Sequence, residues 1–230
     1  MGGDLGREGG QYRAISAGVE REERFGLMSG YSWREDPKRI GFTCSRYKFV
    51  GRMFEGKRSV LEVGCGDGFF SRIVRQYVGW LIGVDSSYAA IGSAKKLQGS
   101  RHHPVVDGYK EIDFNGWDLL EGPLSGFDGV YCLDVLEHVL PDRSDEFLKN
   151  LAGCAPVAIV GMPSLESQAY ASEISKLEHV NTMTKGGLRA AMQRHFAQVF
   201  MLGMNDEVLH TGKDEMTSYL FAIGVNAAAS

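Results

Sequence analysis

The sequence has few cysteines, and none of them lie close together. Its 230 residues include 4 cysteines, and no Cys-x-x-Cys pair occurs among Cys44, Cys65, Cys132 and Cys154. This spacing argues against a zinc knuckle, which needs paired ligands. Cys65, Cys132 and Cys154 lie in or beside apolar runs, where a free cysteine packs as a small core residue. We therefore expect a reducing, cytoplasmic setting.

Long apolar runs and a strong net charge are also missing. No run approaches the roughly 18 apolar residues of a membrane helix, and the N-terminus lacks the apolar core of a secretory signal. The net charge is -4, which favours neither nucleic acid nor an anionic membrane as a partner. The length of 230 residues suits one α/β domain with a terminal extension.

The N-terminal part divides into two segments. Residues 1–30 are rich in Gly, Arg and Glu, and we expect a flexible arm there. Residues 31–56 are expected to form a helical lid, since Asp36 can cap a helix in which Pro37 takes the first position. Apolar residues then recur at helical spacing up to Phe54.

Residues 57–230 alternate between strand-like and helix-like segments. The expected strands are 59–63, 80–84, 109–114, 127–133, 156–162, 199–204 and 217–225. The expected helices are 69–78, 87–97, 134–151 with a break near Pro141, and 184–196 with Thr184 as N-cap. Such alternation predicts a Rossmann-like, doubly wound α/β sheet of seven strands. The last strand follows its predecessor without a helix, so we expect it to be antiparallel.

A glycine-rich segment follows the first strand and opens a helix. Glu62-Val-Gly64-Cys-Gly66-Asp-Gly68 has glycines at alternate positions, which let a ligand approach the main chain closely. Phe69 occupies the place of the third glycine of a dinucleotide-binding loop, and no Gly-Lys-Ser/Thr follows as in a Walker loop. The second strand ends at Asp85, whose carboxylate would accept both hydroxyls of a ribose; the alternative is a helix N-cap.

Three segments together resemble the class I S-adenosylmethionine-dependent methyltransferase superfamily. They are Val60-Leu-Glu-Val-Gly-Cys-Gly-Asp-Gly68, Ile82-Gly-Val-Asp85 and Phe127-Asp-Gly-Val-Tyr-Cys-Leu-Asp-Val-Leu-Glu-His-Val139. The resemblance is strongest to the small-molecule branch that includes ubiquinone-pathway O-methyltransferases, and it covers about residues 58–162. It implies S-adenosyl-L-methionine as cofactor, with Asp85 on the ribose and Asp118 on the adenine amine, or alternatively Asp113. The implied cofactor set is Glu62, Gly64, Cys65, Gly66, Asp85, Ser86, Asp118, Leu119 and Leu133.

Two histidines are candidates for catalysis. Asp134, Glu137 and His138 could share one helical face, and the ubiquinone-type enzymes have a similar arrangement that is associated with a divalent metal. The alternative, which we adopt, is that Glu137-His138 simply begins a helix, as is common in the superfamily, and that no metal is bound. His179 lies in an insertion, residues 164–182, on the side of the sheet that should face the cofactor, and we expect it to act as general base. A surface or structural histidine is the alternative.

Candidate substrate residues come from three segments. The lid offers Tyr31, Trp33, Arg34, Lys38, Arg39, Arg46 and Lys48, which would suit a phosphate or carboxylate unless they form a solvated basic face. The insertion adds Ser164 and Gln168, and the last loop adds Asn205 and His210, which otherwise belong to a polar turn. From these segments we expect Tyr31, Arg34, Arg39, Ser164, Gln168, Asn205 and His210 to bind substrate.

We expect methyl transfer from S-adenosylmethionine to a small polar, anionic or sugar-like metabolite, with oxygen favoured over nitrogen. A homodimer is compatible with this reading. The rival functions are N-methylation, a nicotinamide-dependent oxidoreductase and a non-catalytic cofactor-binding module. The oxidoreductase is disfavoured because the third glycine and a Tyr-x-x-x-Lys pair are both absent.

Overall fold

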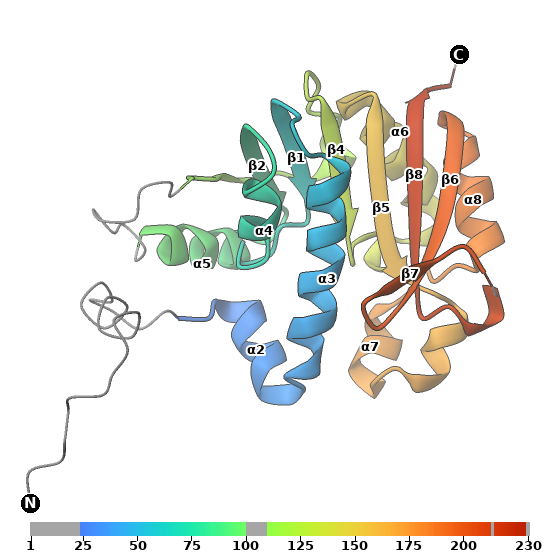
Figure 1. The fold of residues 1–230 in the computed structure, drawn as a ribbon, viewed down its shortest axis with the longest axis horizontal. Coiled ribbons are helices and arrows are strands. Elements are labelled where there is room, and N and C mark those ends of the chain that lie inside the picture. The colour runs from blue at the N-terminus through green and yellow to red at the C-terminus, as the bar shows by residue number, and fades with distance from the viewer. Residues whose placement is uncertain (1–23, 100–109, 213, 229–230) are drawn as a thin grey trace, which may run out of the picture.

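The computed structural model describes residues 24–99, 110–212 and 214–228. Their centre is an eight-stranded sheet in the order β3-β2-β1-β4-β5-β8-β6-β7 (Figure 1). The strands are β1 Ser59–Val63, β2 Trp80–Asp85, β3 Asp113–Gly116, β4 Gly129–Leu133, β5 Val157–Pro163, β6 Phe196–Asn205, β7 Val208–His210 and β8 Tyr219–Ala227. β1 to β5 pair in parallel, whereas β8 is antiparallel to both β5 and β6.

This topology confirms the doubly wound α/β sheet with an antiparallel last strand. The expected count of seven strands omits β7, a three-residue strand that pairs with the end of β6. A two-residue turn joins them, in which Asp206 has a φ of 49°. Because the turn keeps β6 and β7 in one hairpin, the additional strand extends the edge of the sheet without changing its order.

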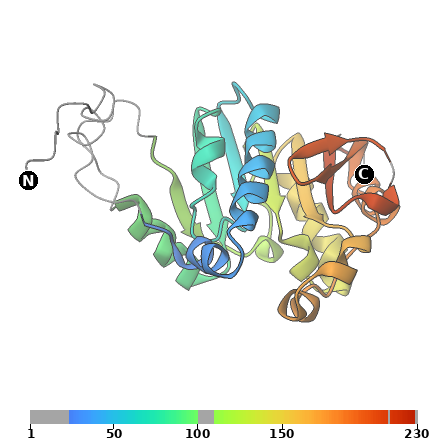
Figure 2. The same ribbon diagram turned by 60° about the horizontal axis from the view of Figure 1, so that its bottom comes forward.

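Helices cover both faces of the sheet. α3 Lys38–Met53, α4 Ser71–Arg75 and α5 Tyr88–Gly99 lie on one face, and α6 Ser144–Cys154 and α8 Lys185–Gln193 lie on the other. α2 Leu27–Glu35 and α7 Glu173–Glu178 lie at the lower rim, which Figure 2 brings forward. The 3-10 helices are η2 Leu119–Glu121, η3 Leu136–His138, η4 Pro141–Arg143, η5 Glu166–Tyr170 and η6 Asp214–Met216.

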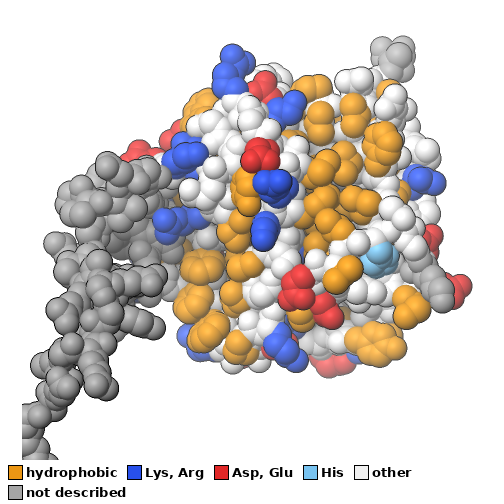
Figure 3. All heavy atoms as spheres, viewed as in Figure 1, with side chains coloured by type: hydrophobic (Ala, Val, Ile, Leu, Met, Phe, Trp, Pro, Cys, Tyr) orange, Lys and Arg blue, Asp and Glu red, His pale blue; other side chains and the backbone are white. Residues whose placement is uncertain are grey.

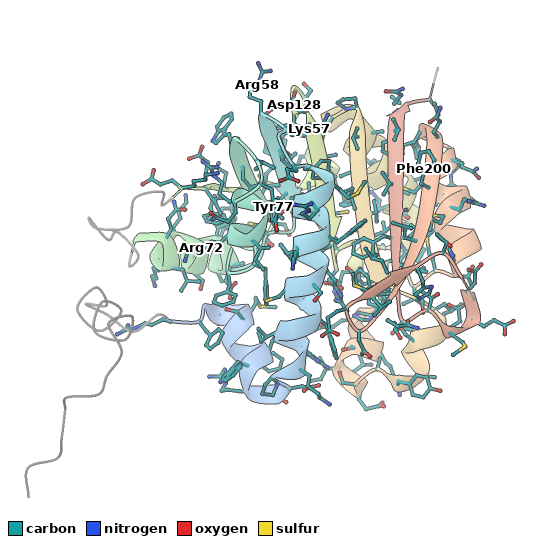
Figure 4. The ribbon with its side chains drawn as sticks, viewed as in Figure 1. Lys57, Arg58, Arg72, Tyr77, Asp128 and Phe200 are labelled. Carbon is teal, nitrogen blue, oxygen red and sulfur yellow. The ribbon has the colours of Figure 1, made fainter. Side chains whose placement is uncertain are left out.

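Each face of the sheet has its own hydrophobic core. Val50 of α3, Phe54 at its C-cap and Ile91 of α5 pack in one cluster, and Leu148 and Leu151 of α6 pack in the other. Among the described residues, no helix covers the upper part of β5, β8 and β6 on the α3 side, and Figure 3 shows hydrophobic side chains there. Phe200 of β6 projects from this region with 55% of its surface exposed (Figure 4). The two cores therefore pack the helices against both faces of the sheet, whose strand ends carry the loops.

Several expected boundaries are wrong. Residues 1–23 lie outside the described part of the chain, but α2 begins at Leu27, so the helical lid starts before the expected arm ends at residue 30. The third strand is Asp113–Gly116 instead of 109–114, and the insertion 164–182 contains η5 and α7. The N-cap at Thr184 is confirmed, because its Oγ1 accepts the N–H of Gly187 at 3.1 Å.

The expected helix 134–151 is the largest error. Asp134 has a φ of 56°, and the chain passes through η3 and η4 before α6 begins at Ser144. A residue in this left-handed region turns the chain sharply, so Asp134 cannot share a helical face with Glu137 and His138. The sharp turn instead directs all three residues toward the carboxyl end of β4.

Candidate cofactor and acceptor site

A cavity of about 620 Å³ opens at the carboxyl ends of β1, β2, β3 and β4. The end of an open parallel sheet is where such folds bind ligands. The expected cofactor residues that line it are Gly64, Cys65, Gly66, Asp85, Ser86, Asp118, Leu119 and Leu133. One expected residue, Glu62, does not line it. The sheet therefore gathers nearly the whole predicted cofactor set around one space.

The glycine loop is built around positive backbone angles. Gly64, Gly66 and Gly68 have φ values of 77°, 55° and 68°. A Cβ at Gly64 would overlap the side chain of Val135, which itself lines the cavity. Glycine is required here both by conformation and by the close approach of the loop after β4.

Asp85 uses both carboxylate oxygens to hold the backbone. Its Oδ2 accepts the N–H of Gly66 at 2.9 Å, and its Oδ1 accepts the N–H of Ser87 at 2.8 Å. The capping interaction and the position on the cavity wall are thus both present. Each carboxylate oxygen has a second lone pair, so this arrangement leaves Asp85 able to accept hydroxyls from a ligand.

The two candidates for the adenine contact lie in different places. Asp118 follows β3, lines the cavity and caps η2 by accepting the N–H of Leu120 at 2.9 Å. Asp113 begins β3 and accepts the indole N–H of Trp80 at 2.8 Å, outside the cavity lining. The structure therefore favours Asp118.

Glu62 lies behind the cavity wall. It is 1% exposed, and its Oε1 accepts the hydroxyl proton of Tyr47 at 2.8 Å. Burial raises the pKa of Glu62 to about 7, against the lowering effect of its hydrogen bonds. Tyr47 does line the cavity, so Glu62 acts on the site through the side chain that it binds.

Helix α2 of the lid is hydrogen-bonded to the glycine loop. Ser29 of α2 donates both its backbone N–H and its hydroxyl to Asp67 Oδ2, at 2.7 Å and 2.8 Å, in a buried setting. Met28 and Ser32 of the same helix line the cavity. A single carboxylate of the loop thus holds α2 across the opening.

Glu137, His138 and His179 form a compact group beside the cavity. Their ligand atoms all lie within 4.8 Å of one another, which suits a metal ion. His138 Nδ1 bonds the Glu178 carbonyl at 3.1 Å, and His179 Nδ1 bonds Gln168 Oε1 at 3.0 Å. Because a carbonyl oxygen only accepts, each Nδ1 donates, which leaves Nε2 as the ring nitrogen that could bind a metal.

The carboxyl group of Glu137 has no hydrogen-bond partner among the described residues. It is 0% exposed, and both of its oxygens are unpaired. Burial, and next the charge of Asp134, raise the pKa of Glu137 well above its usual value. Burial, and next His138, lower the pKa of His179. Buried orphan acceptors of this kind fit a bound cation.

The expected substrate residues are not gathered at the cavity. Tyr31, Arg34 and Arg39 are exposed and absent from its lining, so these three side chains of the lid face solvent. Ser164 and Asn205 are occupied within the fold: Ser164 bonds Thr217 O and Ser167 N, and Asn205 bonds Met216 O and Ser218 N.

The remaining two expected substrate residues do not line the cavity either. Gln168 orients His179, and His210 lies on β7 with a buried Nε2 that has no partner among the described residues. Sequence reasoning missed Thr43 and Tyr47, which line the cavity from α3. Thr43 and Tyr47 are spaced i, i+4, and Val50 and Phe54 continue the same pattern. This pattern marks the inward face of α3, so it could have identified both residues from the sequence.

Residues 61–155 match a protein family described as a methyltransferase domain. The chain is similar to ubiquinone biosynthesis O-methyltransferase of Hahella chejuensis, with 36% identity over 126 residues, which are 55% of this chain and 47% of that protein. It is 36% identical over 98 residues to the mitochondrial ubiquinone biosynthesis O-methyltransferase of Schizosaccharomyces pombe, covering 43% of this chain and 34% of that protein.

Solved structures agree on the fold. The methyltransferase domain of bacterial CtHen1-C matches with a TM-score of 0.66 and 19% identity, over 81% of this chain and 100% of that chain. Magnesium protoporphyrin IX methyltransferase from Synechocystis PCC 6803, solved with bound SAH, matches with a TM-score of 0.59 and 18% identity, over 94% of this chain and 93% of that chain.

Residues 61–155 of this chain are a methyltransferase domain. The resemblance drawn from the glycine loop and the strand ends is therefore confirmed, and the Synechocystis protein with bound SAH has the same fold around its ligand. The chain spans less than half the length of these two curated relatives. In the described part of the chain, no helix is long and apolar enough to cross a membrane.

Proposed function

We propose that the methyltransferase moves the methyl group of S-adenosylmethionine to a hydroxyl oxygen of a small molecule. The observation that carries the proposal is the cavity, which joins the glycine loop, Asp85 and Asp118 to the wall formed by His138. Relatives named as O-methyltransferases support oxygen as the acceptor atom.

The reaction needs alignment more than covalent help from the protein. The acceptor oxygen attacks the sulfonium methyl carbon in line, the carbon–sulfur bond breaks, and S-adenosylhomocysteine leaves. The hydroxyl proton must also be removed for an alcohol or phenol to be a good nucleophile. The methyltransferase residues bind and orient the two reactants, while α2 excludes water from the cavity.

Glu137, His138 and His179 are proposed to hold a divalent cation. The fit rests on the unpaired, buried carboxyl of Glu137 and on two imidazoles whose Nε2 lone pairs are available. This proposal replaces the expectation of a metal-free site with His179 as general base. A cation there would lower the pKa of an acceptor hydroxyl and so remove the need for a separate base.

The acceptor is proposed to be uncharged, which revises the expectation of an anion. Four carboxylates line the cavity, namely Asp67, Asp85, Asp118 and Asp134, whereas Arg143 is the one Lys or Arg among the described lining residues. Carboxylates in this excess suit the positive sulfonium, and apart from the proposed cation only Arg143 of the described lining residues could pair with an anionic acceptor. A sugar-like molecule remains within this class.

The proposal is tested by calorimetric titration with S-adenosylhomocysteine, followed by an assay of S-adenosylmethionine turnover. The acceptor panel contains phenols, catechols, sugars and nucleosides, each with Mn²⁺ or with EDTA. We expect cofactor binding, and turnover that EDTA abolishes. Turnover unaffected by EDTA would remove the cation from the proposal.

The same measurements separate the rivals. Amine acceptors in the panel test N-methylation, and titration with NADH tests the oxidoreductase. Cofactor binding with no turnover on any acceptor would favour a binding module. Homodimerisation and a cytoplasmic location stay predictions, to be checked by light scattering and by cell fractionation.

A further inference from the structure

Arg46 of helix α3 and Asp134 at the end of β4 form an ion pair that joins the lid to the sheet. Nη1 of Arg46 lies 3.2 Å from both carboxylate oxygens of Asp134. The guanidinium carbon lies 3.7 Å from the ring centre of Tyr219, which is 2% exposed. The guanidinium is therefore held between a carboxylate and an aromatic face.

The ion pair leaves part of the guanidinium unused. Nη1 contacts both oxygens of Asp134, whereas the strongest arginine–carboxylate pairs use two parallel N–H···O bonds from two nitrogens. Nε of Arg46 is buried and has no hydrogen-bond partner among the described residues. Because a buried donor without a partner costs free energy, this pair is weaker than a bidentate one.

Asp134 belongs to the same electrostatic surroundings as the proposed cation site. Burial, and next the charge of Asp134, raise the pKa of Glu137. Asp134 also acts on His179, where it opposes the lowering of the pKa by burial and by His138. The carboxylate of Asp134 lines the cavity, with 36% of its side chain exposed. A divalent cation held by the other three residues would therefore attract this carboxylate as well.

Arg46 acts on the same site with the opposite sign. The pKa of Glu137 is raised by burial and by Asp134, and the charge of Arg46 is one of the effects that oppose this rise. An arginine keeps its charge in proteins. The guanidinium and a divalent cation are thus like charges directed to one group of carboxyl oxygens, and they repel each other.

We propose that Arg46 competes with the divalent cation for the carboxylate of Asp134. The cation carries twice the charge of the guanidinium and replaces it at this carboxylate, while the face of Tyr219 continues to hold the guanidinium. Arg46 thereby sets the concentration of cation that the site needs. The inference rests on the proposed function, because it concerns the cation of the same site. Arg46 is a positioning residue, since it acts through Asp134.

The first test measures Mn²⁺ affinity by calorimetry, without any acceptor. Arg46→Met should tighten Mn²⁺ binding about tenfold or more, because it removes both the competitor and its charge. A role of Arg46 in structure alone would weaken binding instead. Unchanged or weaker binding in Arg46→Met would overturn the inference, and S-adenosylhomocysteine binding shows independently that the variant is folded. If the wild type itself binds no Mn²⁺, the cation of the proposed function is overturned together with the inference.

The second test separates competition for Asp134 from simple repulsion between charges. Arg46→Met is combined with Asp134→Asn, which is nearly isosteric and has no charge. The gain in Mn²⁺ affinity from Arg46→Met should be about tenfold larger when Asp134 is present, because only then is an ion pair broken by the cation. An equal gain in both backgrounds would show that Arg46 acts only as a nearby charge, and would overturn the competition.

A matched control comes from the same helix. Arg52 of α3 pairs with Glu55 at 3.2 Å, and both side chains are more than half exposed. Arg52→Met makes the same chemical change without touching the cavity, so it should leave Mn²⁺ affinity within about threefold of wild type. A gain equal to that of Arg46→Met would assign the effect to net charge and overturn the inference.

The third test observes the exchange in the wild type by NMR of the ¹⁵N-labelled protein. Mg²⁺ is the probe because it is diamagnetic, and its binding is verified by its displacement of Mn²⁺ in calorimetry. Saturating Mg²⁺ should shift the Nη signals of Arg46, whose ion pair breaks, and leave those of Arg52 in place. Unchanged Arg46 signals with Mg²⁺ bound would overturn the exchange.

Discussion

Asp85 and Asp128 are two carboxylates with the same local task at opposite ends of the sheet. Asp85 accepts two backbone N–H groups beside the cavity, and Asp128 accepts those of Arg58 and Ser59 at 2.9 Å and 3.0 Å. Figure 4 shows Asp128 and Arg58 together at the end of the sheet far from α2. Comparing variants of the two residues therefore distinguishes the proposed contact of Asp85 with the cofactor from the hydrogen bonds that both residues make to the backbone.

We predict that Asp85→Ala weakens S-adenosylhomocysteine binding by about 1–3 kcal/mol, because polar groups of the ribose lose their partner. Asp128→Ala should leave the affinity unchanged while it lowers stability to a similar extent. Calorimetric titration and urea unfolding of both variants measure the two effects. Equal affinity losses in both variants would assign the Asp85 effect to backbone structure alone.

Glu62 makes the stability of the protein depend on pH. Its pKa is raised from 4.5 to about 7 in the folded protein, chiefly by burial. Below pH 4.5 the carboxyl is protonated in both states. Between pH 4.5 and 7 the unfolded chain ionises first, so stability falls as pH rises, and it levels off above pH 7.

We predict that Glu62→Gln removes this dependence, which amounts to at most about 3 kcal/mol across the interval. The difference in unfolding free energy between Glu62→Gln and wild type should therefore be more positive at pH 8 than at pH 5. Urea unfolding at the two pH values measures it. Parallel pH profiles for the two proteins would show that Glu62 keeps an ordinary pKa.

At the scale of elements, the loop between β1 and α4 packs so closely against the loop after β4 that a side chain at Gly64 would not fit. Gly64 and Gly56 have nearly equal φ values, 77° and 79°, but a Cβ at Gly64 would overlap Val135, whereas a Cβ at Gly56 would have no atom within 4 Å. The two glycines therefore share one conformational requirement and differ in packing.

We predict that Gly56→Ala lowers stability by about 1–2 kcal/mol, the strain of a left-handed alanine. Gly64→Ala should lower it by a further 1–3 kcal/mol, roughly, through overpacking against Val135, and should abolish S-adenosylhomocysteine binding. Thermal unfolding and calorimetry measure both variants. Retained binding in Gly64→Ala would mean that the two loops move apart without altering the cavity.

At the scale of the whole molecule, cofactor binding should stabilise the complete domain, because the cavity joins loops from four strands and the lid. At a ligand concentration 100 times Kd, the gain is about 2.7 kcal/mol, which for a chain of this size raises Tm by about 5–10 °C. Thermal unfolding with S-adenosylhomocysteine measures the shift. Calorimetric binding without a shift in Tm would show that the domain does not unfold as one unit.

Local sequence was sufficient for the layered sheet and for most of the cofactor wall. Hydrophobic periodicity and glycine spacing report short-range requirements, so the strand ends carrying Gly64, Gly66, Asp85 and Asp118 were predictable. The error in the expected helix 134–151 could not be foreseen from the sequence. The left-handed backbone angle at Asp134 accompanies contacts with α3 and β5, which are distant in sequence. A helix-like pattern in sequence does not reveal such a turn.

The sequence by itself determined the fold class and the antiparallel last strand, and it predicted the residues of the proposed cofactor site. Only the tertiary structure decided the contacts on the side proposed for the acceptor. It placed Arg46 on Asp134 across 88 residues, brought His179 to Glu137 and His138, and left Arg34 and Arg39 in solvent. The physical reason is range: backbone conformation and strand order follow from neighbouring residues, whereas contacts between separate loops depend on how the sheet and the lid pack together.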